Sequence, residues 1–112
     1  MTPREAIGPV IDCLRDMNLR KIVVFGSATG GKTYEDSDLD LALVVPDPEN
    51  SQVFNRTEVA LEARRRLRQV NAQVAMDILV YTASEFQKLA SQPSSFRTEI
   101  IEGGRTVYER AG

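Results

Sequence analysis

Two short apolar runs, separated by a loop rich in glycine and aspartate, constrain the fold of this chain most strongly. Ile22–Phe25 and Leu41–Val45 carry no charge, which is typical of strands that are buried on both faces. The segment between them begins with Gly26-Ser27 and ends with Asp38-Leu39-Asp40. A loop of small residues suits a phosphate group, and paired aspartates suit a metal ion. We therefore expect two core strands that present a functional loop.

Composition sets limits on the function. A chain of 112 residues is expected to form one domain, residues 1–112. The net charge of -2 does not indicate a broad basic surface for nucleic acid. Histidine is missing from the sequence, which excludes His-based triads and leaves carboxylates for metal and proton chemistry. The lone Cys13 is expected to be a small apolar residue of the core. No apolar run approaches the length of a membrane span, so the expected compartment is the cytoplasm.

Periodicity and turn signals predict an α+β fold, a small mixed sheet flanked by helices. Thr2 and Glu5 form a predicted capping box for a first helix that ends near Asn18. The expected strands are Arg20–Phe25, Asp38–Val45, Gln73–Tyr81 and an edge strand at Arg105–Glu109. The expected helices are Ser51 to about Val70, a short one opened by the Thr82 and Glu85 capping box and ended by Pro93, and one or two turns at Phe96–Glu102.

The Ser51–Val70 segment has an apolar face with an arginine cluster near its end. Phe54, Ala60, Leu61, Leu67 and Val70 make up most of that face. Arg64, Arg65, Arg66 and Arg68 are either a solvated face, supported by a Glu62–Arg66 pair, or a contact for a phosphate or an acidic partner.

One interpretation of the central loop is a P-loop. Gly26 to Thr33 matches the pattern G-x-x-x-x-G-K-[ST], in which Lys32 would contact the β- and γ-phosphates and Thr33 would bind magnesium. A P-loop must lead into a helix. Only four residues lie between Thr33 and the next expected strand, too few for that helix and for a crossover to a parallel strand.

A second interpretation uses the whole stretch from Gly26 to Asp40. The Gly26-Ser27 turn gives phosphates access to backbone N–H groups and a hydroxyl. Asp38 and Asp40 project from one face of their strand, and Asp77 can converge on them from another. A pair of Mg²⁺ ions would relieve the repulsion among the three carboxylates. Alternating Asp and Leu is, however, also the pattern of a half-exposed strand.

These motifs resemble the signature of the polymerase-β-like nucleotidyltransferase superfamily. The matching elements are Gly26-Ser27, ten residues, then Asp38-x-Asp40, with Asp77 in Met76-Asp77-Ile78-Leu79 as the third carboxylate. The short chain and its end, Ile101 to Tyr108, are similar to the minimal members of that superfamily. Gly30 departs from the pattern, because members often carry arginine or another large polar residue there.

The resemblance implies transfer of a nucleoside monophosphate, with AMP as the expected group, from ATP or another NTP to a hydroxyl group. Minimal members often act as the antitoxin beside a small helical HEPN-type protein and adenylylate its tyrosine. Asp38, Asp40 and Asp77 would then be the catalytic residues and the ligands of two Mg²⁺ ions. Gly26, Ser27, Lys32 and Ser37 would form the nucleotide-binding set. The alternative is a module of the same fold that neutralises its partner by contact alone, through the edge strand near Val107 or the arginine-rich helix.

Overall fold

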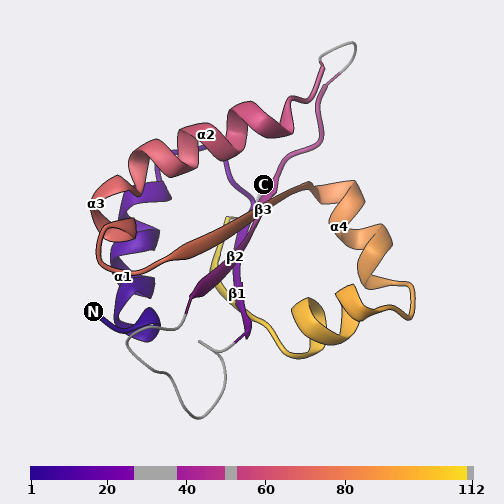
Figure 1. The fold of residues 1–112 in the computed structure, drawn as a ribbon. Coiled ribbons are helices and arrows are strands. Elements are labelled where there is room, and N and C mark those ends of the chain that lie inside the picture. The colour runs from indigo at the N-terminus through magenta and orange to yellow at the C-terminus, as the bar shows by residue number, and fades with distance from the viewer. Residues whose placement is uncertain (27–37, 50–52, 111–112) are drawn as a thin grey trace.

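The computed structural model describes residues 1–26, 38–49 and 53–110. Its elements are α1 (Pro3–Leu14), β1 (Lys21–Phe25), β2 (Leu39–Val45), α2 (Arg56–Arg66), α3 (Arg68–Asn71), β3 (Met76–Thr82), α4 (Ala83–Ala90), a π-helical segment η2 (Arg97–Glu102) and β4 (Arg105–Glu109). The strands form one mixed sheet in the order β3-β2-β1-β4 (Figure 1). β1 pairs antiparallel with both β2 and β4, whereas β2 pairs parallel with β3. The predicted fold class is therefore confirmed.

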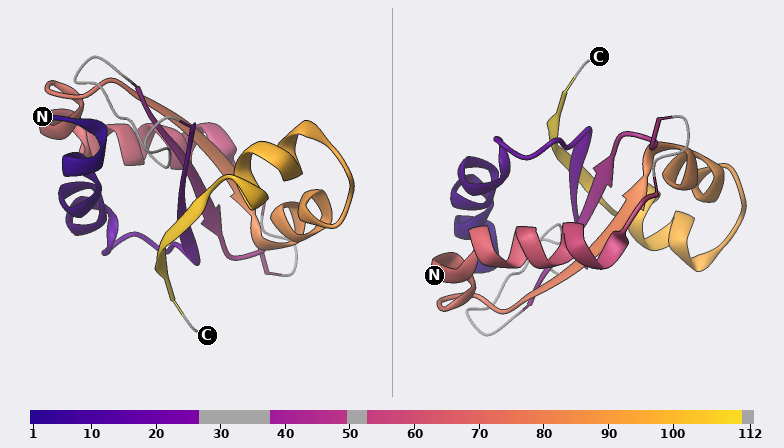
Figure 2. Two further views of the ribbon diagram at one scale, coloured as in Figure 1. Left: turned by 90° about the horizontal axis from the view of Figure 1, so that it is seen from below. Right: turned by 90° about the horizontal axis from the view of Figure 1, so that it is seen from above.

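Helices cover both faces of the sheet, as the two apolar central strands require. α1, α2 and α3 lie on one side, and α4 and η2 lie on the other (Figure 2). Alternate residues of each strand enter different cores because successive side chains point to opposite faces. Leu41 and Leu43 of β2 pack in the larger core, toward α1–α3, while Ala42 and Val44 pack in the smaller core with Phe86 and Ile100.

Both predicted capping boxes are present at the starts of α1 and α4. The Thr2 and Thr82 hydroxyls accept hydrogen bonds from the backbone N–H groups of Glu5 and Glu85, and the glutamates accept in return from the threonine N–H groups. These reciprocal bonds satisfy N–H groups that would lack partners in a helix end. The starts of α1 and α4 could therefore be predicted directly from the sequence.

The predicted bounds of three elements are wrong. α1 ends at Leu14 with Arg15 as its C-cap, before Asn18, because the chain turns and places Leu19 in the core. The predicted helix Ser51–Val70 begins only at Arg56, where the side chain of Asn55 caps the N–H of Glu58, and it breaks at Leu67 into α2 and α3. β3 starts at Met76 rather than Gln73, because Gln73 and Val74 donate backbone hydrogen bonds to Val70 in a turn.

The C-terminal elements agree with expectation. η2 is followed by Gly103-Gly104, and β4 is an edge strand beside β1. A β carbon on Gly104 would lie 2.1 Å from the carbonyl oxygen of Ile100, so only glycine permits this close return of the chain. Among the described residues, no helix has the length and apolar character that crossing a membrane would require.

Candidate active site

Asp40 and Asp77 are direct neighbours on adjacent strands. In the parallel pair β2–β3, Asp40 is the register partner of Asp77, and in the antiparallel pair β1–β2 it is the partner of Phe25. Phe25, Asp40 and Asp77 thus form a row across three strands. Because Leu39 and Leu41 point into the larger core, Asp40 projects from the opposite face of the sheet. Both carboxylates therefore lie on the face of the sheet that α4 and η2 cover nearer the C-terminal end of β2.

The electrostatics of Asp40 show that negative charge is crowded here. Burial raises the pKa of the Asp40 carboxyl above its ordinary value, and the charges of Asp77 and Asp38 raise it further. A hydrogen bond with the Asp77 side chain adds to the same effect, since it favours the protonated form of Asp40. The fold therefore places Asp77 and Asp38 near enough to Asp40 for their charges to act on it.

The donor set fits a hard divalent cation. Carboxylate oxygens are the ligands that Mg²⁺ prefers, and a cation would lower the pKa that the crowding raises. Among residues 1–26, 38–49 and 53–110, no three Asp, Glu, Cys or His side chains form a ready-made metal cage. The metal-binding role of Asp38, Asp40 and Asp77 stays a prediction.

Gly26 lies against Asp40 at the end of β1. Its φ of 76° falls in the left-handed region that favours glycine, and a β carbon would meet Oδ2 of Asp40. A small pocket of about 320 Å³ opens beside the two residues and is also lined by Phe25, Glu99 and Gly103. Residue 26 therefore has no side chain at the point where an anionic group would approach the carboxylates.

Glu99 is a residue of this pocket that sequence reasoning missed. It comes from η2, more than twenty residues after Asp77, and belongs to no motif that would have marked it. It lines the pocket together with Phe25, Gly26 and Asp40. A larger cavity, with a volume of about 850 Å³, lies elsewhere in the described structure, along β3.

Three predicted nucleotide-binding residues, Ser27, Lys32 and Ser37, lie outside the described residues, as does Gly30. The strands at either end of that segment are nonetheless described. They are antiparallel neighbours, β1 and β2, whereas a P-loop strand leads through a helix to a parallel strand. The P-loop interpretation is therefore wrong.

The arginines of the cluster differ in their surroundings. Arg65 and Arg66 pair with Glu62 at 2.6 Å and 3.0 Å, which is the predicted solvated face with its Glu62–Arg66 contact. Arg64 instead lines the larger cavity along β3.

Leu61, predicted to belong to the apolar face of the helix, is 56% exposed, so that prediction is wrong. Cys13 is half-buried and packs against the larger core.

Known proteins share this sequence pattern and fold. Residues 10–111 match the family model for polymerase beta nucleotidyltransferases. A toxin–antitoxin structure with AMP-PNP superposes with a TM-score of 0.60 at 18% identity, over 93% of this chain and 73% of that one. A mutant of the toxin–antitoxin pair MntA–HpeT, carrying two Asp-to-Glu substitutions, gives a TM-score of 0.58 at 15% identity over the same shares.

A protein from Sulfolobus solfataricus assigned to the nucleotidyltransferases gives a TM-score of 0.54 at 20% identity, over 96% of this chain and 77% of that one. Comparison with curated proteins gave no match. At these identities the structural neighbours establish the fold, and the family model covers nearly the whole chain. The chain therefore belongs to the polymerase-β-like nucleotidyltransferases.

Proposed function

We propose that this nucleotidyltransferase moves AMP from ATP, in a Mg²⁺-dependent reaction, to a hydroxyl group on a toxin partner. The acceptor we propose is a tyrosine of a small helical HEPN-type protein, which the transfer would inactivate. The observation that carries the proposal is the row of Phe25, Asp40 and Asp77 across three adjacent strands, with Gly26 against the Asp40 carboxylate. The similarity to toxin–antitoxin structures, one of them with the ATP analogue AMP-PNP, supports the choice of nucleotide and partner.

Each end of the row suits a different part of the reaction. At the β1 end, the exposed backbone of Gly26 suits the β- and γ-phosphates, together with Ser27 and, more weakly, Lys32. Ser37 would orient the loop that carries Asp38. At the β3 end, Asp77 is the carboxylate farthest from Gly26 in the strand order, so the acceptor hydroxyl would approach there.

The proposed transfer forms one bond and breaks one. The acceptor oxygen bonds to the α-phosphorus, the bond from that phosphorus to the bridging oxygen breaks, and pyrophosphate leaves. Asp77 accepts the proton of the acceptor hydroxyl. Asp38 and Asp40 would hold both Mg²⁺ ions, with Asp77 on one of them, and bound Mg²⁺ would stabilise the charge that develops on the α-phosphate and on pyrophosphate. The cytoplasm, where NTP is abundant, is the compartment we propose.

The test is incubation with ATP labelled at the α-phosphate, Mg²⁺ and the protein encoded beside this one. We expect label on a tyrosine of that protein, and loss of labelling with Asp40→Asn or Asp77→Asn. Asp12→Asn serves as the matched control, since Asp12 is an exposed residue of α1. Absence of labelling by the wild type, or equal labelling by Asp40→Asn, would contradict the proposal.

The same assay separates catalysis from neutralisation by contact. If wild type and Asp40→Asn rescue growth equally when co-expressed with the neighbouring protein, the chain acts as a binding module and the catalytic proposal fails. If only the wild type and Asp12→Asn rescue growth, transfer is the means of neutralisation.

A further inference from the structure

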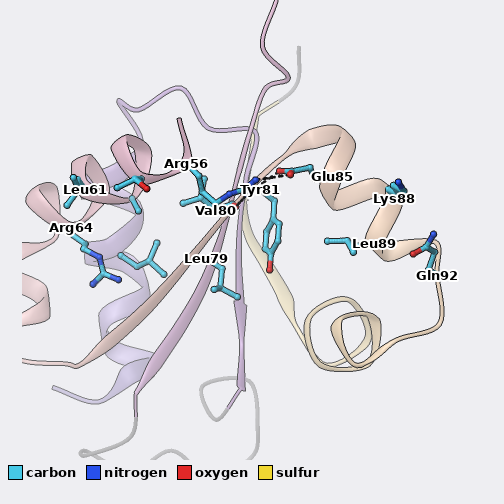
Figure 3. Close-up of a pocket in the computed structure, with 13 residues that line it drawn as sticks. Arg56, Leu61, Arg64, Leu79, Val80, Tyr81, Glu85, Lys88, Leu89 and Gln92 are labelled. Atoms are coloured by element: carbon cyan, nitrogen blue, oxygen red, sulfur yellow. Dashed lines mark hydrogen bonds and ion pairs between the residues drawn. The ribbon is translucent and has the colours of Figure 1, made fainter. Parts of the chain in front are cut away.

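The larger cavity is an open groove that follows the outer edge of β3 (Figure 3). α2 forms one wall, with Leu61 and Arg64, and α4 forms the other, with Lys88 and Leu89. Leu79 of β3 lies between the walls and is 39% exposed, while Leu61 is 56% exposed. Large apolar side chains rarely gather on an exposed surface unless another molecule covers them.

Apart from one internal ion pair, the charged side chains that line the groove are positive. Glu85 is bound to Arg56, with 2.8 Å between Oε2 and Nη2. Arg64 and Lys88 remain at the walls, and neither forms an ion pair within the described part of the chain. An occupant that complements this groove therefore has an apolar stripe with acidic side chains beside it.

The groove also adjoins the candidate active site. It begins at Ile78, the residue after Asp77, and Leu79 projects from the same face of β3 as Asp77. In the strand order, Gly26 lies on the far side of Asp40 from β3. A molecule seated along β3 would consequently reach Asp77 from the side opposite to the phosphate-binding end.

The backbone of β3 indicates what kind of segment fits. An extended peptide in this groove could continue the sheet only by hydrogen bonding to the outer edge of β3. Arg56 obstructs this edge, because its guanidinium donates to the carbonyl oxygen of Val80 and is held there by Glu85. Side-chain contacts from a helix need no such backbone bonds, and helices bind apolar grooves through one face.

We infer that the groove between α2 and α4 is the docking surface for an amphipathic helix of the partner protein, with an apolar stripe flanked by acidic residues. The helix lies over Leu61, Leu79 and Leu89, and its acidic residues pair with Arg64 and Lys88. This inference rests on the proposed function for the identity of the partner. It adds the surface that delivers the acceptor to Asp77.

The experiment measures binding of the protein encoded beside this one, without ATP or Mg²⁺, by calorimetry. We expect Leu61→Gln, and the double variant Arg64→Glu with Lys88→Glu, each to weaken binding by about tenfold or more. The wild-type affinity should also fall as salt increases. Matched controls are Val53→Gln, at an apolar residue that is 91% exposed outside the groove, and Arg68→Glu, at an exposed arginine of α3. Both controls should bind as the wild type does.

Amide hydrogen exchange of the wild-type complex supplies a second measurement that needs no variant. Binding should slow exchange in α2 and α4 and leave β4 unchanged. Wild-type affinity in both groove variants, slowed exchange confined to other elements, or no binding of the neighbouring protein would each overturn the inference. If the groove variants lose binding while the wild type transfers no label, the docking surface stands and the proposed transfer fails.

Discussion

Oδ2 of Asp40 occupies the space that a β carbon on Gly26 would need, with only 2.2 Å between the two positions. The end of β1 and the central carboxylate of β2 therefore fit together only while residue 26 has no side chain. The positive φ of Gly26 adds a second reason for glycine, since other L-residues are strained in that conformation. Glycine here serves the fold and the site at once.

Substituting Gly26 by alanine should damage stability and activity together. The left-handed conformation costs an L-residue about 1–2 kcal/mol, so the free energy of unfolding should fall by about that amount. The new methyl group also displaces the Asp40 carboxylate, so nucleotide transfer should be largely lost. Urea denaturation and transfer of label from ATP measure the two effects.

Gly8→Ala is the matched control for that variant. Gly8 lies inside α1, where an added β carbon meets nothing within 4 Å. Alanine is favoured over glycine in a helix interior by about 0.5–1 kcal/mol, so this variant should be more stable than wild type and equally active. Wild-type stability and activity in Gly26→Ala would contradict the proposed contact.

Asp40→Asn should stabilise the protein in the absence of divalent cations while abolishing transfer. The folded-state pKa of Asp40 is raised by burial and by Asp77 and Asp38, so the ionised carboxylate destabilises the fold at neutral pH. Asparagine removes that charge at similar size. Thermal unfolding in EDTA should give a higher Tm for Asp40→Asn than for wild type.

Adding Mg²⁺ should reverse the order of stability. A ligand that binds only the folded state raises the Tm of wild type, and Asp40→Asn loses part of the binding site. Asp12→Asn, altered at an exposed carboxylate of α1, should respond to Mg²⁺ as wild type does. An equal rise in Tm for Asp40→Asn and wild type would count against Asp40 as a ligand.

The pairing of Asp40 with Asp77 was within reach of sequence reasoning because both carboxylates interrupt apolar strands. Alternation along each strand fixes the face from which each aspartate projects. Because burying an unpaired carboxylate costs free energy, an aspartate within an apolar run indicates a functional or structural role. The confirmed capping boxes at Thr2 and Thr82 were similarly local, because residues three apart in sequence make them. Patterns that a few consecutive residues determine could be predicted.

The features that sequence reasoning missed depend on distant contacts. Glu99 reaches the Asp40 pocket only because η2 packs beside β1. Leu61 fits a helical apolar spacing, yet the core ends before it and leaves it exposed over the groove. The break at Leu67 and the late start of α2 depend on the cap at Asn55 and on how α1 packs against α2 and α3.

Glu85→Gln should lower the free energy of unfolding at neutral pH and make it less dependent on pH in the acid range. Hydrogen bonds from Arg56 and from the Thr82 backbone lower the pKa of Glu85 from 4.5 to about 2. A carboxyl whose pKa is lower in the folded state stabilises the fold above its unfolded value, and this contribution is lost as pH falls from 4.5 toward 2. Glutamine keeps the capping box but carries no charge.

The Glu85 effect should be modest because its side chain is 41% exposed. We expect a loss of about 0.5–1 kcal/mol at neutral pH that disappears near pH 2, measured by urea denaturation across the acid range. Glu109→Gln, at an exposed carboxylate paired with Lys21 at 3.5 Å, is the comparison for removal of a charge alone. A Glu85→Gln deficit that persists unchanged at pH 2 would show that packing, and not ionisation, is responsible.

Asp77→Ala should harm catalysis more than Lys32→Ala, although Lys32 belongs to the string that matches a P-loop. We propose that Asp77 accepts the acceptor proton, and on that proposal its loss should lower kcat about 10²-fold or more with little change in KM for ATP. Lys32 would supply one charged hydrogen bond to a phosphate, and its loss should raise KM by about tenfold. Steady-state label transfer to the neighbouring protein measures both constants. If Lys32→Ala abolished ATP binding while Asp77→Ala kept its turnover, the order of severity would be reversed, and the assignment of the proton acceptor to β3 would be wrong.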